Sequence, residues 1–346
     1  MIVDGKKVLL LGMLILALVL AGCNSDDGSE SAQQLSATPA NFDEVLNSVK
    51  AKPGNYVINL TGDLIDYPGN SIGTAGVNIT VKGTGSNKIT WKYAGSPFFG
   101  VKAGKLSLEN INLSRSPGNT QDWPLIVIDG GTVEVKNGAV LSNNNGSPTF
   151  IGVGLFAGAF IMSGGIIENF DSGVSTSGKG VSITMSGGTI RNNSQAGIVA
   201  WDGSENCNVS ISGGTISDND WRGVMVVGAG NRLTMSGGTI TGGAGRGVVI
   251  GTGTKFTMSG GTISKNNWGL NLAGANVEFE KKKGAVIYGN SGDNKNNEGA
   301  IWVNTRGNPA NDLKLLLDAG KDDVYAIKTN SDNTDIVAGS KQGPNW

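Results

Sequence analysis

Apolar and polar residues alternate along most of the chain, and the pattern returns every 23 to 26 residues. The clearest copies contain an apolar residue, then Ser-Gly-Gly, then Thr-Ile or a close variant. They begin at Ser163, Ser186, Ser212, Ser236 and Ser259, so the steps are 23, 26, 24 and 23 residues. A repeat of this length is typical of solenoids, propellers and arrays.

Within each copy the apolar residues stand two positions apart, with Ser or Thr between them. This period of two predicts strands that turn one side inward. The inward positions before the Ser are Phe160 and Met162, Ile183 and Met185, Val209 and Ile211, Leu233 and Met235, and Phe256 and Met258. Those after it are Ile167, Ile190, Ile216, Ile240 and Ile263. The same frame extends upstream to Ile58 and Leu60 and downstream to Val277, Phe279 and Val286, which makes about ten coils.

A second ladder of short strands follows the copies, each opened by a glycine and an apolar residue. One predicted inner stack contains Val174, Ile198, Val224, Val248 and Leu270. A second, two residues further on, contains Ala200, Val226, Ile250, Leu272 and Trp302. The outward positions of this ladder are also apolar: Val199, Trp201, Met225, Val227, Val249, Ile301 and Val303. Such a strip predicts a contact surface for a loop, for the C-terminal segment or for a partner.

Twenty-three residues can circle a small perimeter as three short strands with turns. A propeller blade needs about 40 residues, and the leucine frame of a leucine-rich repeat is absent. Stacked equivalent strands are parallel, and parallel crossovers are almost always right-handed. The sequence therefore predicts an all-β fold, a right-handed parallel β-helix solenoid of about ten coils.

Both ends of the solenoid carry a predicted cap, because an uncovered coil would expose its core and strand edges. Residues 41–50 have helical spacing, with Asn41 as the expected N-cap. Leu313–Leu317 and Val324–Ile327 are expected to be strands that end the solenoid. The predicted domains are a β-helix with its N-terminal cap over 41–306 and a C-terminal cap over 307–346.

Asparagines gather in the turn between the two ladders, at Asn143, Asn144, Asn169, Asn192, Asn193, Asn219, Asn266, Asn267 and Asn290. Asparagine tolerates left-handed backbone geometry, and stacked amides can form a hydrogen-bonded ladder. The alternative is a calcium-binding repeat, which places an aspartate in every turn. Aspartates are too sparse here for that pattern, so neither a metal nor a cofactor is expected.

The N-terminal residues have the pattern of a targeting segment. Lys6-Lys7 precede an apolar stretch from Val8 to Leu20, which is short for a membrane span. Leu20-Ala21-Gly22-Cys23 resembles the lipobox of bacterial lipoproteins, which implies a signal peptide over 1–22 and lipidation of Cys23. An ordinary signal peptide cleaved near Gly22 is the alternative. Residues 23–40 are polar and small, and they predict a lipidated flexible tether.

Composition excludes several function classes. The net charge is −1, and the run Lys281-Lys282-Lys283 is expected to be a solvated turn, so no nucleic-acid partner is predicted. The chain has no histidine, which removes Ser-His and Cys-His nucleophile pairs and histidine metal sites. Apart from Cys23 the only cysteine is Cys207, whose parity predicts a buried, inert thiol.

With its period, its strand alternation and its lipobox, the chain resembles the pectate-lyase-like β-helix superfamily over residues 41–306. It is most similar to repeat-rich bacterial surface lipoproteins with phrases such as Met-Ser-Gly-Gly-Thr-Ile. Members of the superfamily that cleave pectin use clustered calcium-binding aspartates with a basic residue, and the hydrolases use aspartates around Asn-Thr-Asp. Neither pattern is intact here, since Asn333-Thr334-Asp335 lies in the C-terminal tail.

Two groups of residues are candidates for a site. The position before the second-ladder glycine holds Arg222, Arg246, Trp268 and Glu298 on neighbouring coils, and Trp221 precedes Arg222. Stacked Arg and Trp side chains can bind sugars or an acidic glycan, or can form a structural cation–π ladder. The second group is Asp171, Asp202, Asp218 and Asp220, of which Asp171 and Asp220 are expected in the same column two coils apart. Paired carboxylates can hydrolyse glycosides, and turn aspartates are also common.

The sequence thus predicts a lipid-anchored protein of the cell envelope, at the outer membrane or the cell surface. Its expected role is non-catalytic binding, adhesion or structure, with a carbohydrate or an extracellular matrix protein as ligand. A polysaccharide lyase or glycoside hydrolase that uses the turn aspartates is the first alternative, and a purely architectural envelope protein is the second.

Overall fold

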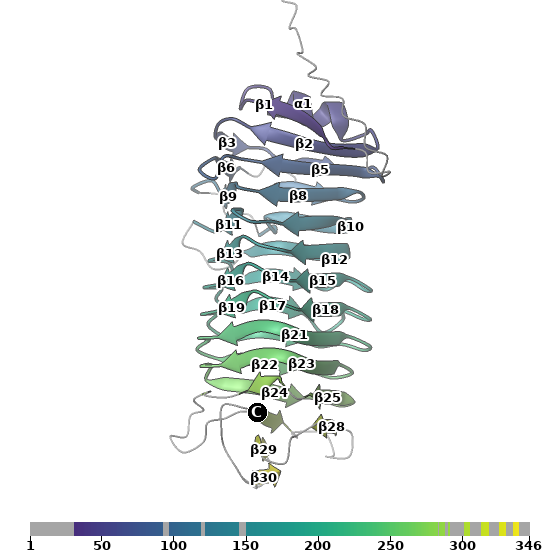
Figure 1. Cartoon of the computed structure of the whole chain (residues 1–346), viewed down its shortest axis with the longest axis vertical. Coiled ribbons are helices and arrows are strands. Elements are labelled where there is room, and N and C mark those ends of the chain that lie inside the picture. Colours follow the sequence, from purple (N-terminus) through teal and green to yellow (C-terminus); the bar gives the residue numbers. More distant parts are fainter. Residues whose placement is uncertain are drawn as a thin grey trace, which may run out of the picture. The chain divides into compact units, whose positions relative to one another are not determined.

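The computed structural model describes residues 31–92, 97–118, 122–144, 150–282, 284–287 and 290, together with the backbone of four later strands at 301–304, 313–317, 325–329 and 335–338. The chain divides into two units, Met1–Ser31 and Ala32–Trp346, and the fold is that of the second. This unit is a parallel β-solenoid of about ten turns with one short helix near its N-terminus (Figure 1). The predicted fold class is confirmed.

Each regular turn contributes strands to three faces, which follow one another along the chain. Face 1 contains β1 (Gln33–Ala37), β2 (Gly54–Leu60), β5 (Val77–Lys82), β8 (Lys105–Glu109), β10 (Ile126–Val135), β12 (Ile151–Met162), β15 (Ser182–Met185), β18 (Asn208–Ile211), β21 (Arg232–Thr241), β23 (Lys255–Ser264), β25 (Val277–Lys281) and β28 (Leu313–Leu317). Face 2 contains β3 (Leu64–Tyr67), β6 (Lys88–Trp91), β9 (Asn112–Arg115), β11 (Val140–Ser142), β13 (Ile166–Glu168), β16 (Thr189–Arg191), β19 (Thr215–Ser217) and β26 (Val286–Ile287).

Face 3 corresponds to the predicted second ladder. It contains β4 (Asn70–Ile72), β7 (Phe99–Val101), β14 (Ser172–Thr176), β17 (Ala196–Ala200), β20 (Arg222–Val226), β22 (Arg246–Ile250), β24 (Trp268–Ala273), β27 (Ile301–Asn304) and β29 (Tyr325–Thr329). Strands β10 and β12 continue from face 3 into face 1, and β21 and β23 continue from face 1 into face 2. The last strand, β30 (Asp335–Ala338), pairs with β29 in the antiparallel direction.

Strictly registered columns of apolar side chains fill the interior. On face 1, Met162, Met185, Ile211, Met235 and Met258 follow one another in register, and each is at most 1% exposed. The isoleucines after the Ser-Gly-Gly phrase form a matching buried column on face 2. The inward positions predicted from the alternation are confirmed.

The two glycines of the repeated phrase are required for different reasons. The second glycine adopts the left-handed backbone region, for example at Gly188 with φ +78°. The first glycine does not, but a Cβ on Gly187 would lie 2.5 Å from the carbonyl oxygen of Ser163 in the preceding turn. The phrase therefore makes a corner between faces 1 and 2 in which successive turns pack backbone against backbone.

The asparagine-rich turn separates into two columns with distinct roles. Asn169, Asn192 and Asp218 adopt positive φ, and Gly242 and Lys265 continue this left-handed column. One residue later the side chains turn inward, and Asn193, Asn219, Asn266 and Asn290 are at most 1% exposed. Asn193 donates from Nδ2 to Oδ1 of Asn219 at 2.8 Å, and Asn266 donates in the same way to Asn290 at 3.1 Å. The predicted amide ladder exists, with a gap at Gly243.

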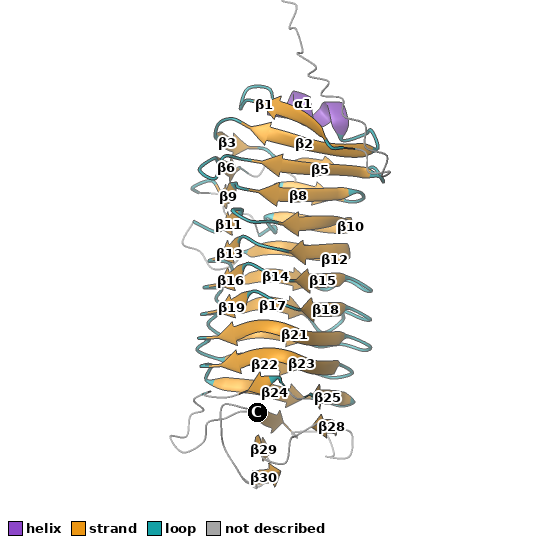
Figure 2. Cartoon of the chain, viewed as in Figure 1, coloured by secondary structure: helices purple, strands orange, loops and turns teal. Residues whose placement is uncertain are grey.

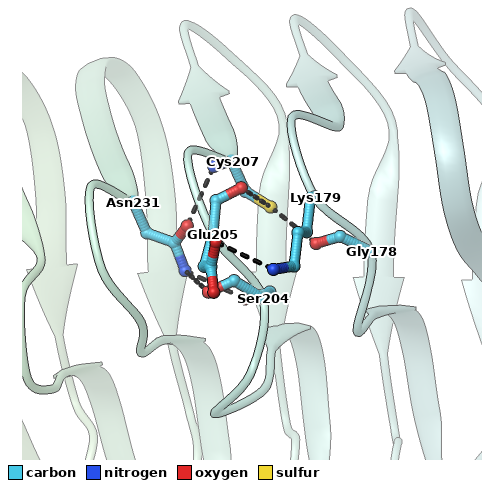
Figure 3. Close-up of polar contacts among 6 residues, drawn as sticks. All are labelled: Gly178, Lys179, Ser204, Glu205, Cys207 and Asn231. Carbon is cyan, nitrogen blue, oxygen red and sulfur yellow. Dashed lines mark hydrogen bonds and ion pairs between the residues drawn. The ribbon is translucent and has the colours of Figure 1, made fainter.

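A second polar network lies at the corner between faces 3 and 1 (Figure 3). The main-chain nitrogen of Cys207 donates to Oδ1 of Asn231 at 2.8 Å, and the thiol donates to the carbonyl oxygen of Gly178 at 3.2 Å. On the surface of this corner, Lys179 and Glu205 form an ion pair of 3.0 Å. Cys207 is fully buried, as its parity predicted.

The N-terminal end of the solenoid differs in part from expectation. The only helix among the described residues, α1 (Phe42–Val49), buries Phe42, Leu46 and Val49, and it lies at the N-terminal end of the strand stack (Figure 2). Asn41 precedes it but makes no side-chain cap, because its Oδ1 accepts hydrogen bonds from Thr38 instead. Strand β1 pairs in parallel with β2, so the residues 33–37 of the predicted flexible tether belong to the solenoid.

Near both ends of the solenoid, the predicted register of the inner columns differs from the observed register by two residues. Ile58 pairs with Val81, so Tyr56 and Ile58 continue the inner columns that had been predicted for Ile58 and Leu60. At the other end Phe279 pairs with Phe256, which places Lys281 opposite Met258. Lys281 is consequently fully buried, and the predicted solvated lysine turn is wrong at that residue. Lys282 is exposed, and Lys283 lies outside the described residues.

In the last predicted turn of face 3, the observed strand register differs from the predicted register by one residue. Ile301 and Val303 pair with Leu270 and Leu272, in the inner columns. Trp302 pairs with Asn271 in an outer column, although the sequence placed it in the inner stack. The frame fails here because the chain between β26 and β27 does not keep the repeat length of the earlier turns.

Candidate functional site

The predicted neighbour relation of the basic and aromatic residues on face 3 is confirmed by the strand register. Arg222 pairs with Ala196, Arg246 pairs with Arg222, and Trp268 pairs with Arg246. We call Ala196, Arg222, Arg246 and Trp268 the arginine column. Each member opens one strand of face 3 on a successive turn, immediately before a buried glycine. Glu298, the fourth predicted member, lies outside the described residues.

Trp221 lies beside this column and is 45% exposed. The guanidinium carbon of Arg222 lies 3.4 Å from the centroid of the Trp221 ring, which is a close cation–π contact. A planar guanidinium can stack on an aromatic face and still keep its N–H groups in its own plane, where they can donate hydrogen bonds. The pair therefore presents an apolar ring and a set of donors at one position on the surface.

Electrostatics set the column apart from the rest of the surface. Desolvation and, to a smaller extent, the positive charge of Arg246 together lower the pKa of Arg222 to about 10. Desolvation also lowers the pKa of Arg246. Both side chains stay protonated at neutral pH, so two partly buried positive charges lie on adjacent turns, one rise of about 4.8 Å apart.

Two polar atoms at this corner are buried without a hydrogen-bond partner among the described residues, Nη1 of Arg222 and Oε1 of Gln195. The two residues are neighbours, because the main-chain nitrogen of Arg222 donates to the carbonyl oxygen of Gln195 at 3.0 Å. Sequence reasoning missed Gln195. A single glutamine at a turn forms no recognisable pattern in one sequence. Only its buried Oε1, which has no hydrogen-bond partner among the described residues, distinguishes it in the structure.

The four candidate aspartates do not converge on one point. Asp171 and Asp220 occupy the same column two turns apart, with Ser194 between them, as the hydrogen bonds from the nitrogen of Ser194 to Phe170 and from that of Asp220 to Asn193 show. Asp218 is an exposed left-handed turn residue, and Asp202 is exposed at the opposite end of β17. The structure brings together only the first pair.

Asp171 has a more protected setting than the other three. Burial raises the pKa of its carboxyl group, while hydrogen bonds from the hydroxyls of Ser172 (3.2 Å) and Ser194 (3.5 Å) act in the opposite direction. Asp220, by contrast, is exposed. One protected and one exposed carboxyl group in a column is an arrangement that acid–base chemistry can use.

The outward strip of face 3 is partly covered. Val199 and Val249 are buried although they point away from the interior, and Met225 between them is half-buried. Part of the cover over Val199 is Trp201, whose Nε1 donates to the hydroxyl of Ser175, the register partner of Val199, at 3.0 Å. Within the described residues this strip is an apolar band beside the arginine column.

Within the same described ranges, no three His, Cys, Asp or Glu side chains are grouped as metal ligands, and no helix has the length and apolar character to cross a membrane. Cys23 lies outside these residues. A comparison of the sequence with protein-family models and with curated proteins finds no match.

Proposed function

We propose that this protein is a non-catalytic binding module of the cell envelope, and that its ligand is a carbohydrate or a matrix component. The observation that supports it is the Trp221–Arg222 stack beside Arg246 on one surface column. Aromatic rings pack against the apolar faces of sugars, and guanidinium groups donate paired hydrogen bonds to oxygen acceptors. Most inward and turn residues of the repeat are used for core packing and corners, whereas basic and aromatic side chains lie on adjacent turns at this column.

Removing the indole of Trp221 tests the proposal. Trp221→Ala should weaken binding to a ligand identified on a glycan and matrix array by about tenfold or more, because an aromatic anchor carries a large share of binding energy. The measurement is isothermal titration calorimetry. Trp123→Ala is the matched control, since Trp123 is 44% exposed but no arginine of the described residues stacks on its ring, and it should bind like the wild type. Equal affinities of both variants, or no ligand of any class, would contradict the proposal.

We also propose attachment to the outer membrane or the cell surface through lipidated Cys23, on the basis of the Leu20-Ala21-Gly22-Cys23 pattern. Two or more acyl chains give stable anchoring without a membrane-spanning segment. Cells grown with labelled palmitate should incorporate label into the protein, and Cys23→Ser should lose it. Label that persists in Cys23→Ser would contradict lipidation at Cys23, and a wild type without label would favour an ordinary signal peptide.

A polysaccharide hydrolase or lyase is the second candidate, favoured by the raised pKa of Asp171 in the same column as Asp220. The same polysaccharides, scored for reaction products with and without calcium, separate the two functions. If products form with the wild type and are absent with Asp220→Asn, the protein is an enzyme and the proposal of a non-catalytic binding module is wrong. A chain that neither binds nor cleaves any of them would be architectural.

A further inference from the structure

We propose that a cavity on the outer surface of face 2 is a second binding site, and that it takes a neutral mono- or disaccharide. The cavity lies over β6, β9 and β11 on three successive turns, and its volume is about 390 Å³. Ligand-binding cavities span about 300–1,000 Å³, so a ligand of this small size fits. The site is separate from the arginine column on face 3 and does not depend on it.

The floor of the cavity consists of two outward columns of face 2, which the strand register places side by side. One column contains Lys88, Asn112 and Val140, and the other contains Thr90, Ser114 and Ser142. Neighbouring members of a column lie on hydrogen-bonded strands about 4.8 Å apart. Three hydroxyl groups and one amide group therefore line a single hollow within reach of one small ligand.

Ser142 carries a hydroxyl group that the fold leaves unused. The residue is 8% exposed, yet no described residue forms a hydrogen bond with this hydroxyl, although buried polar groups are nearly always hydrogen-bonded. Ser142 lines the cavity, and its oxygen is not one of the fully enclosed polar atoms, so a ligand in the cavity can reach it. A serine hydroxyl both donates and accepts, as the hydroxyls of a sugar do.

A stack of side chains holds the turn side of the cavity in place. Arg115, the last residue of β9, lines the cavity and is 1% exposed. Its guanidinium carbon lies 4.9 Å from the ring centroid of Trp91, at the end of β6, and 3.5 Å from that of Phe150. Because this stack fixes the cavity before a ligand arrives, binding has to order few side chains.

The groups around the cavity favour a neutral ligand. Lys88 is exposed, and its ammonium group has no ion pair within the described part of the chain. The main-chain nitrogen of Lys88 donates to a carboxylate oxygen of Asp63 at 2.8 Å, so a negative charge lies near the same strand end. The guanidinium of Arg115 is enclosed between two rings. An anion thus finds little net attraction, whereas Val140 and Pro117 offer apolar surface to the C–H groups of a sugar.

Replacing Ser142 with alanine tests the inference, because the change removes only the hydroxyl group. Affinity for the sugar should fall by about three- to tenfold, the loss expected for one hydrogen bond. Ser217→Ala is the matched control and should bind like the wild type. Ser217 lies in the same outward column of face 2 and is 9% exposed, but it does not line the cavity.

A second variant, Ser114→Phe, fills the cavity and should abolish binding. Its control is Thr241→Phe, which adds the same ring to a half-buried position of the same column away from the cavity. The probes are neutral mono- and disaccharides and the corresponding uronic acids, first screened by saturation-transfer nuclear magnetic resonance and then titrated by calorimetry.

We expect a neutral sugar that binds the wild type and both controls alike, weakens with Ser142→Ala and is lost with Ser114→Phe. Equal affinities of Ser142→Ala and Ser217→Ala, binding of the uronic acids alone, or no binding by any of these sugars would overturn the inference. A sugar whose binding depends on Trp221 but not on Ser142 would also overturn it and would leave the proposed function standing.

Discussion

Replacing Asn219 with alanine is expected to lower the free energy of unfolding by about 4 kcal/mol. Oδ1 of Asn219 accepts from both the main-chain nitrogen and Nδ2 of Asn193, at 3.1 and 2.8 Å. Nδ2 of Asn219 reaches the carbonyl oxygen of Ile190 at 3.4 Å. The substitution leaves two buried donors without an acceptor, and each such donor costs about 1–3 kcal/mol.

Urea unfolding followed by circular dichroism measures this change from the midpoint and the slope of the transition. Asn208→Ala is the control, because Asn208 lies in β18 with its side chain exposed. It should shift stability by no more than about 0.5 kcal/mol. If the two variants unfold together, the amide ladder contributes no more than an ordinary surface residue.

Replacing Gly223 with alanine is expected to cost about 3 kcal/mol. Gly223 is the second residue of β20 and has no positive φ, so alanine has no backbone strain there. Its Cβ, however, would lie 2.5 Å from Cγ2 of Ile240 and 2.6 Å from the carbonyl oxygen of Gly247, both in the next turn. Overpacking a close-packed interior costs about 1–3 kcal/mol, and here one of the obstacles is backbone that cannot turn aside.

The same geometry recurs along face 3, because a Cβ on Gly197 would meet Ile216 at 2.6 Å and one on Gly247 would meet Ile263 at 2.8 Å. Gly73→Ala is the matched control, since nothing lies within 4 Å of its Cβ position and its φ is not positive. That variant should be unchanged or more stable by up to about 1 kcal/mol. A Gly223→Ala protein as stable as Gly73→Ala would show that the turns can separate at this corner without cost.

The candidate site could be predicted only in part. The constant position before the glycine was enough to place Arg222, Arg246 and Trp268 on successive turns, because equivalent positions of a repeat stack in register. The stacking of Arg222 on Trp221 and the buried acceptor of Gln195 could not be predicted, since both depend on side-chain conformations at an irregular turn. The repeat frame also placed Asp171 and Asp220 in one column two turns apart, and the structure confirms this.

The sequence by itself determined the solenoid and its interior. A period of 23 to 26 residues and an alternation of two place every inward residue of the regular turns, because covalent spacing dictates which positions recur. Only the tertiary structure decided the register beyond the regular turns. There the intervening segments differ in length, so Lys281 came to lie opposite Met258 and Trp302 opposite Asn271. The tertiary structure also decided which polar atoms at the Arg222 corner have partners, since hydrogen bonds between turns join residues that the repeat pattern does not distinguish.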